Sequence, residues 1–78
     1  PGSILSMPQT TIKTERRGNA VILTNTGKYP AIGVHIEVPE KMDQLIVSEN
    51  YIWLNPQESK KLKINLESPV IVKGWNLQ

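Results

Sequence analysis

The chain has 78 residues, no cysteine and a formal net charge of +2, from nine lysines and arginines against seven acids. This length corresponds to one domain, and the missing cysteines exclude a disulfide framework and thiolate zinc sites. So small a positive charge does not favour nucleic acid as a partner, and no apolar run approaches the roughly 20 residues of a membrane helix.

The first nine residues are predicted to lie outside the folded domain. Pro1-Gly2-Ser3 is typical of an expression-tag remnant, and residues up to 9 are interpreted as a frayed end. A single domain is therefore expected over residues 10–78.

From residue 10 onward, apolar residues recur with a period of two, as in antiparallel strands that bury one face. Ile32, Val34, Ile36 and Val38 are expected to face the core, with Ala31, Gly33, His35 and Glu37 on the opposite side. The strand beginning at Ala20 is apolar at both phases, which indicates a central position in a sheet. Lys61 and Lys63 are expected to share a solvated face.

Turn-forming residues punctuate the chain at short, regular intervals, which favours many short strands over a few long ones. Seven such strands with turns between them predict an all-β fold, an immunoglobulin-like β-sandwich with Greek-key connections. The predicted strands are Thr10–Glu15, Ala20–Asn25, Ala31–Val38, Leu45–Val47, Tyr51–Leu54, Ser59–Leu66 and Val70–Trp75.

The chain offers little for catalysis or metal binding. His35 is the one histidine, and its phase on the strand predicts a surface or interface position. The acids are scattered along the chain and match no catalytic pattern, and no glycine-rich phosphate loop is present. We therefore expect no catalytic residue, no metal site and no cofactor.

The aromatic residues are the candidates for a contact site. Tyr51 and Trp53 lie two apart, so on a strand they share a face, with Asn50 as a polar neighbour. Such rings either stack against a sugar or pack in the core or against another domain. Because the chain has no phenylalanine, the rings are expected to supply much of the core volume. Trp75 is expected to act as a lid that anchors the last strand.

Three phrases of the sequence resemble a known domain. These are Thr24-Asn25-Thr26-Gly27 with Pro30-Ala31, the run from Ser48 through Tyr51 and Pro56 to Lys60, and Val72-Lys73-Gly74-Trp75-Asn76. From Thr11 to Asn76 the chain resembles the C-terminal immunoglobulin-like domain of family-two glycoside hydrolases, of the β-mannosidase and exo-β-glucosaminidase type.

The resemblance implies a non-catalytic accessory domain. In such enzymes the catalytic glutamates lie on a separate (β/α)-barrel, so the expected partners are that barrel and other domains of the same chain. Two alternatives stay open: a carbohydrate-binding module that holds an oligosaccharide on Tyr51 and Trp53, or another bacterial sandwich such as an adhesin or linker module. A bacterial periplasmic or secreted location is expected. The candidate contact residues, for sugar or another domain, are Asn50, Tyr51, Trp53 and Trp75.

Overall fold

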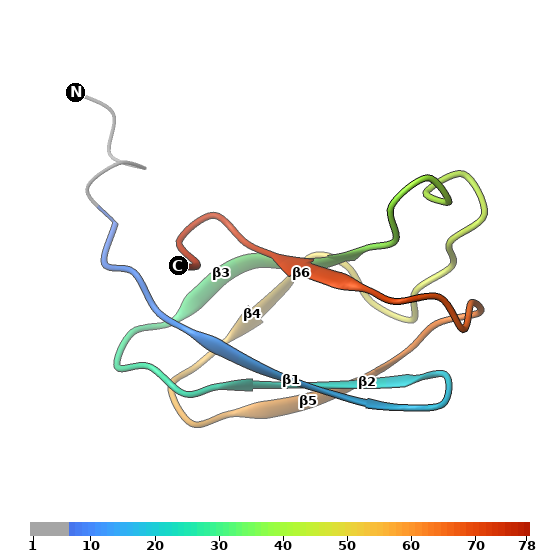
Figure 1. Cartoon of the computed structure of the whole chain (residues 1–78). Coiled ribbons are helices and arrows are strands. Elements are labelled where there is room, and N and C mark those ends of the chain that lie inside the picture. Colours follow the sequence, from blue (N-terminus) through green and yellow to red (C-terminus); the bar gives the residue numbers. More distant parts are fainter. Residues whose placement is uncertain (1–6) are drawn as a thin grey trace.

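A computed structural model, which describes residues 7–78, shows two antiparallel sheets packed face to face (Figure 1). One sheet has the strand order β1-β2-β5 and the other β4-β3-β6. The strands are β1 (Ile12–Arg17), β2 (Ala20–Asn25), β3 (Ala31–Glu37), β4 (Ile52–Leu54), β5 (Ser59–Lys63) and β6 (Ile71–Lys73). The predicted all-β immunoglobulin-like sandwich is confirmed. The proposed tag remnant and the predicted frayed end as far as residue 6 lie outside the described residues, and of the remaining three residues Pro8 accepts a hydrogen bond from Asn76.

The seventh predicted strand, Leu45–Val47, is wrong. Within the described residues this segment makes a single isolated bridge, between Val47 and Ile64. The side chain of Asn65 explains why, because its Oδ1 accepts the Ile46 N–H at 2.7 Å and its Nδ2 donates to the Gln44 carbonyl at 2.8 Å. Both side-chain bonds, together with the backbone bond from the Asn65 N–H to the Ile46 carbonyl, hold the segment beside the end of β5 where a regular ladder was expected.

β1 extends further toward the turn than predicted, to Arg17 where the predicted strand ended at Glu15. Arg17 pairs with Ala20, so only Gly18 and Asn19 form the connection, with Gly18 at φ +58°. A two-residue loop of this kind lets the ladder continue to the turn. The start of the predicted strand is instead taken up by a parallel bridge from Thr10 to Leu77.

The core is aliphatic, contrary to the expectation that aromatic rings would fill it. The largest fully buried apolar side chains are leucines, valines and an isoleucine drawn from both sheets: Leu23, Ile36, Leu54, Leu62, Val21, Val34 and Val38. β2 contributes Val21 and Leu23 from the centre of its sheet, as its apolar pattern predicted. All four aromatic residues are exposed.

A bulge in β3 changes which side chains face the core. Ala31 pairs with Leu54 and Val34 with Ile52, so Ile32 and Gly33 together oppose one residue of β4. Gly33 has φ +67°, a backbone conformation that favours glycine. Ala31 is therefore buried and Ile32 half-buried, the reverse of the predicted phase, while Val34 and the later residues follow the prediction.

Two buried asparagines from the resemblance phrases close the end of the sandwich. Asn25 Oδ1 accepts from Thr10 Oγ1 at 2.8 Å and from the Gly27 N–H at 2.9 Å, and its Nδ2 donates to the carbonyls of Tyr29 and Leu54. Every polar atom of this side chain is thus satisfied, as a buried amide requires.

Asn76 performs the same task for the second sheet. Its Oδ1 accepts the Ile32 N–H at 2.9 Å, and its Nδ2 donates to the carbonyls of Pro8 and Pro30 at 2.9 and 2.7 Å. These two phrases are therefore structural, since their asparagines tie loops together.

Candidate functional site: an aromatic sheet face

Exposed rings gather on the outer surface of the β4-β3-β6 sheet. In β4 the side chains of Ile52 and Leu54 are buried, so Trp53 between them points outward and is 58% exposed. Tyr51 is 66% exposed and Trp75 62%. We call this surface the aromatic face, and define it by His35, Tyr51, Trp53, Ile71 and Trp75.

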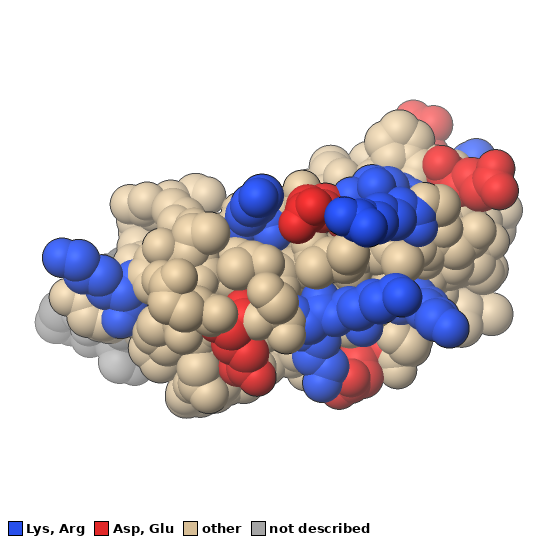
Figure 2. Space-filling view, turned by 90° about the horizontal axis from the view of Figure 1, so that it is seen from below, with Lys and Arg blue, Asp and Glu red and all other residues tan. Residues whose placement is uncertain are grey.

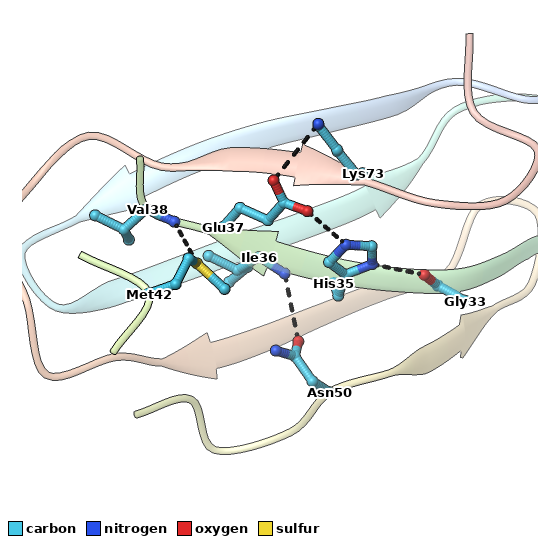
Figure 3. A network of polar contacts seen from close by, with 8 residues as sticks. All are labelled: Gly33, His35, Ile36, Glu37, Val38, Met42, Asn50 and Lys73. Carbon is cyan, nitrogen blue, oxygen red and sulfur yellow. Dashed lines mark hydrogen bonds and ion pairs between the residues drawn. The ribbon is translucent and has the colours of Figure 1, made fainter. Parts of the chain in front are cut away.

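His35 and Tyr51 form the only aromatic pair among the described residues, with ring centroids 4.5 Å apart and a tilt of 51°. The His35 ring is also held at both nitrogens, with Nδ1 3.0 Å from the Gly33 carbonyl and Nε2 3.0 Å from Glu37 Oε2 (Figure 3). Both partners are acceptors, so both contacts are hydrogen bonds only when the ring carries two protons. His35 thus lies between Tyr51 on one side and the Gly33 carbonyl and Glu37 carboxyl on the other.

Glu37 joins this cluster to β6. Its Oε1 lies 3.5 Å from Lys73 Nζ, and β3 and β6 place His35 directly opposite Lys73 in the sheet. The hydrogen bond from His35 holds the pKa of the Glu37 carboxyl below its ordinary value, partial burial acts in the opposite direction, and Lys73 lowers the pKa further. The carboxylate is thus kept charged beside the rings.

Trp75 is exposed but not free, because its ring lies against the backbone at Gly33. A β-carbon placed at Gly33 would come within 2.7–2.8 Å of three atoms of the Trp75 ring. The Trp75 N–H donates to the Ile32 carbonyl at 2.9 Å. Trp75 follows β6 and covers the outside of the β3 bulge, away from the core.

The two remaining candidate residues, Trp53 and Asn50, each make a side-chain hydrogen bond within the domain. Trp53 Nε1 donates to Asn55 Oδ1 at 2.8 Å, which fixes its ring. Asn50 Oδ1 accepts the Ile36 N–H at 3.4 Å, so this amide bonds to the side of β3 that faces β4. The structure therefore brings Tyr51, Trp53 and Trp75 to one sheet face, with Asn50 at its margin.

The outer surface of the other sheet has a different character. The registers of β1, β2 and β5 place four basic side chains on it, together with Glu15 and the uncharged residues Ala20, Ile22, Thr24 and Ser59. Figure 2 shows this face, with Lys and Arg gathered across it. Its basic residues are Lys13, Arg17, Lys61 and Lys63, and the predicted shared face of the last two is confirmed. One sheet thus presents charge to water and the other presents rings.

The aromatic face offers features suited to binding another molecule or domain. The described residues form no pocket, and no group of three metal-ligating side chains occurs among them. No helix within residues 7–78 is long and apolar enough to cross a membrane. A flat surface of held rings with a charged cluster beside it is suited to binding another surface.

Two residues that shape the aromatic face were not singled out as site candidates by the sequence reasoning. Gly33, which receives the Trp75 ring without belonging to the face, depends on its positive φ, which no local pattern reveals. Ile71 was assigned only to a strand, and its outward direction follows from its pairing with Glu37. The alternation of β3 did place His35 opposite the core, which was the available signal.

The chain is an immunoglobulin-like sandwich domain, because it has two stacked sheets around an aliphatic core. The aromatic face of one sheet is available for contact with another molecule or domain. A family model described as the exo-beta-D-glucosaminidase Ig-fold domain matches residues 4–77. The chain therefore belongs to this family of Ig-fold domains, which confirms the resemblance to family-two glycoside hydrolases. No curated protein and no solved structure matches the chain.

Proposed function

We propose that this chain is a non-catalytic accessory domain of an exo-β-glucosaminidase-type glycosidase. In this proposal it docks through the aromatic face on another domain of the same enzyme chain, most directly the catalytic (β/α)-barrel. The single observation that carries the proposal is the concentration of exposed rings on one sheet face, opposite a charged one.

Physical chemistry supports docking on this face. Monomeric domains seldom leave large contiguous apolar patches in water, and patches of that kind mark contact surfaces. Tyrosine and tryptophan are also the side chains that contribute most to interfaces, because they bury much area at little cost in conformational entropy. The Trp53 indole is already held by its hydrogen bond to Asn55, and the Trp75 ring already lies against Gly33, so docking would order little further.

A carbohydrate-binding module is the second candidate, because Tyr51 and Trp53 are exposed on one side of β4. One feature counts against it. The amide oxygens of Asn50 and Asn55, polar groups beside these rings, already accept hydrogen bonds within the domain.

The two candidates are separated by the indole NMR signals of Trp53 and Trp75. Docking predicts no saturable shift with millimolar β-linked glucosamine or mannose oligomers. It also predicts that both indoles are shielded from a soluble relaxation agent in the enzyme chain that carries the domain. Saturable sugar shifts at Trp53 would instead establish the binding module. Indoles equally accessible in the enzyme and in the 78-residue chain would refute docking.

The finer assignments remain predictions. A β-mannosidase-type parent is the alternative to an exo-β-glucosaminidase, and a periplasmic or secreted bacterial location is proposed for either. The absence of bond-cleaving activity is likewise proposed, supported by the lack of a pocket among residues 7–78.

A further inference from the structure

The strand edges of the sandwich differ in how they are covered. The segment that precedes β4 lies along the free edge of β5. The Ser48 N–H donates to the Lys63 carbonyl at 2.9 Å, and Glu49 Oε1 lies 2.8 Å from Lys60 Nζ. β1 is a charged strand, a common protection of an edge. In the other sheet β4 and β6 are both edge strands, and within residues 7–78 each pairs with β3 alone; β6 is the edge strand that carries Ile71 and precedes Trp75 of the aromatic face.

The direction of the backbone groups on β6 follows from one hydrogen bond. The Ile36 N–H donates to Asn50, which lies on the chain leading into β4, so the backbone groups of Ile36 face β4 (Figure 3). In an antiparallel ladder these directions alternate, so the N–H and C=O of His35 and Glu37 face β6. β3 and β6 therefore exchange hydrogen bonds at the pairs formed by His35 with Lys73 and Glu37 with Ile71.

It follows that Val72 directs its own N–H and C=O away from β3. Val72 stands opposite Ile36, the residue whose backbone groups face the other way. The next residues with the same direction along an extended chain are Val70 and Gly74. Within the described residues, none of these three N–H groups donates to a loop or turn.

From this edge we infer that the docking partner supplies an extended segment that pairs with β6 as a fourth strand of the β4-β3-β6 sheet. The inference rests on the proposed docking function and names its chemistry. A row of outward N–H and C=O groups at strand spacing is matched by an extended backbone, the β-augmentation mode of recognition. Ile71 and Trp75 lie on the aromatic face at this same edge, so an added strand would extend that face.

Amide hydrogen exchange at Val72 tests the inference, comparing the 78-residue chain with the enzyme chain that carries the domain. Pairing should slow exchange at Val72 by at least ~10-fold in the enzyme. If the Trp53 and Trp75 indoles are shielded there but Val72 exchanges as fast as before, the added strand is refuted and docking stands. If neither changes, both proposals fail.

A proline variant removes the outward group itself. Val72→Pro deletes the N–H that points to the open edge and spares the hydrogen bonds between β6 and β3, a position where edge strands accept proline. The 78-residue variant should keep its far-ultraviolet circular dichroism spectrum. In the enzyme, protection at Val70 and Gly74 should fall to the level of the isolated chain. Val72→Ala keeps the N–H and should retain protection, whereas retained protection in Val72→Pro would overturn the inference.

Discussion

Gly33 combines two requirements that no other described residue shares. Its φ of +67° disfavours a β-carbon, and that carbon would also collide with the Trp75 ring. Gly18 meets only the first requirement, because at φ +58° it has no atom within 4 Å of the β-carbon position. A substitution at Gly18 therefore measures the cost of backbone strain alone, and one at Gly33 measures that cost plus the cost of displacing the Trp75 ring.

Gly33→Ala should lower the free energy of unfolding by about 2–4 kcal/mol, the sum of left-handed strain and overpacking against the ring. Gly18→Ala should cost about 1 kcal/mol, from strain alone. Urea unfolding followed by circular dichroism measures both losses. Equal losses in the two variants would mean that the Trp75 ring is not seated on Gly33.

The cluster around Glu37 predicts a dependence of stability on pH. Its pKa is lowered in the folded chain, first by the hydrogen bond from His35, so the unfolded chain binds this proton more readily. The contribution is therefore complete above the ordinary value of 4.5 and is lost as the pH falls through the folded pKa. Glu37→Gln should lose less stability than the original chain between pH 6 and 3, measured by urea midpoints. Parallel pH profiles for the two chains would contradict this assignment.

At the scale of elements, Arg16 holds the β1–β2 turn against the connection from β5 to β6. Its Nε donates to the Gly18 carbonyl at 2.7 Å. Its Nη1 donates to the Ser68 carbonyl at 2.7 Å and its Nη2 to the Leu66 carbonyl at 2.8 Å. The planar guanidinium reaches all three acceptors, which a lysine ammonium cannot do in the same geometry. Arg17, by contrast, is 75% exposed and 3.9 Å from Glu15.

Arg16→Lys should therefore lower the free energy of unfolding by about 1–2 kcal/mol, the value of the lost hydrogen bonds. Arg17→Lys should change it by less than about 0.5 kcal/mol, as exposed ion pairs contribute little. Thermal unfolding of both variants at one pH provides the comparison. Similar melting temperatures for the two variants would show that the three hydrogen bonds of Arg16 add no stability.

Most elements could be predicted from the alternation of apolar residues, and the exceptions have physical causes. The range of β2 was predicted as observed, because every residue of that central strand is constrained by two neighbours. β3 departs from its pattern at Ile32, where the bulge depends on a glycine conformation and not on hydrophobicity. The strand predicted at Leu45–Val47 fails because Asn65, distant in sequence, takes its backbone partners.

The site was predictable to a smaller extent. The spacing of two residues predicted a shared face for Tyr51 and Trp53, although β4 itself begins at Ile52, after Tyr51. The approach of Trp75 to Gly33, and of His35 to Tyr51, requires the pairing of β3 with both β4 and β6. These are contacts between distant segments, which a local period does not encode.

Across the whole molecule, the buried core is free of aromatic rings and the tryptophans lie outside it. We therefore expect the intrinsic tryptophan fluorescence to respond weakly to unfolding, because both indoles are more than half exposed in the fold. Covering the aromatic face should instead shift the emission to shorter wavelength. Fluorescence and circular dichroism recorded in one urea titration check the first point. A large blue shift of the folded chain relative to the unfolded one would contradict it.

The aliphatic core has a consequence for how this domain can change over time. Because Tyr51 and Trp53 contribute nothing to the buried interior, the scaffold can exchange them without rebuilding its packing. Trp75 is the exception, since Gly33 was left without a side chain to receive it. Most of the proposed docking surface can thus change in sequence while the sandwich beneath it keeps its packing, so one scaffold could present different faces to different neighbouring domains.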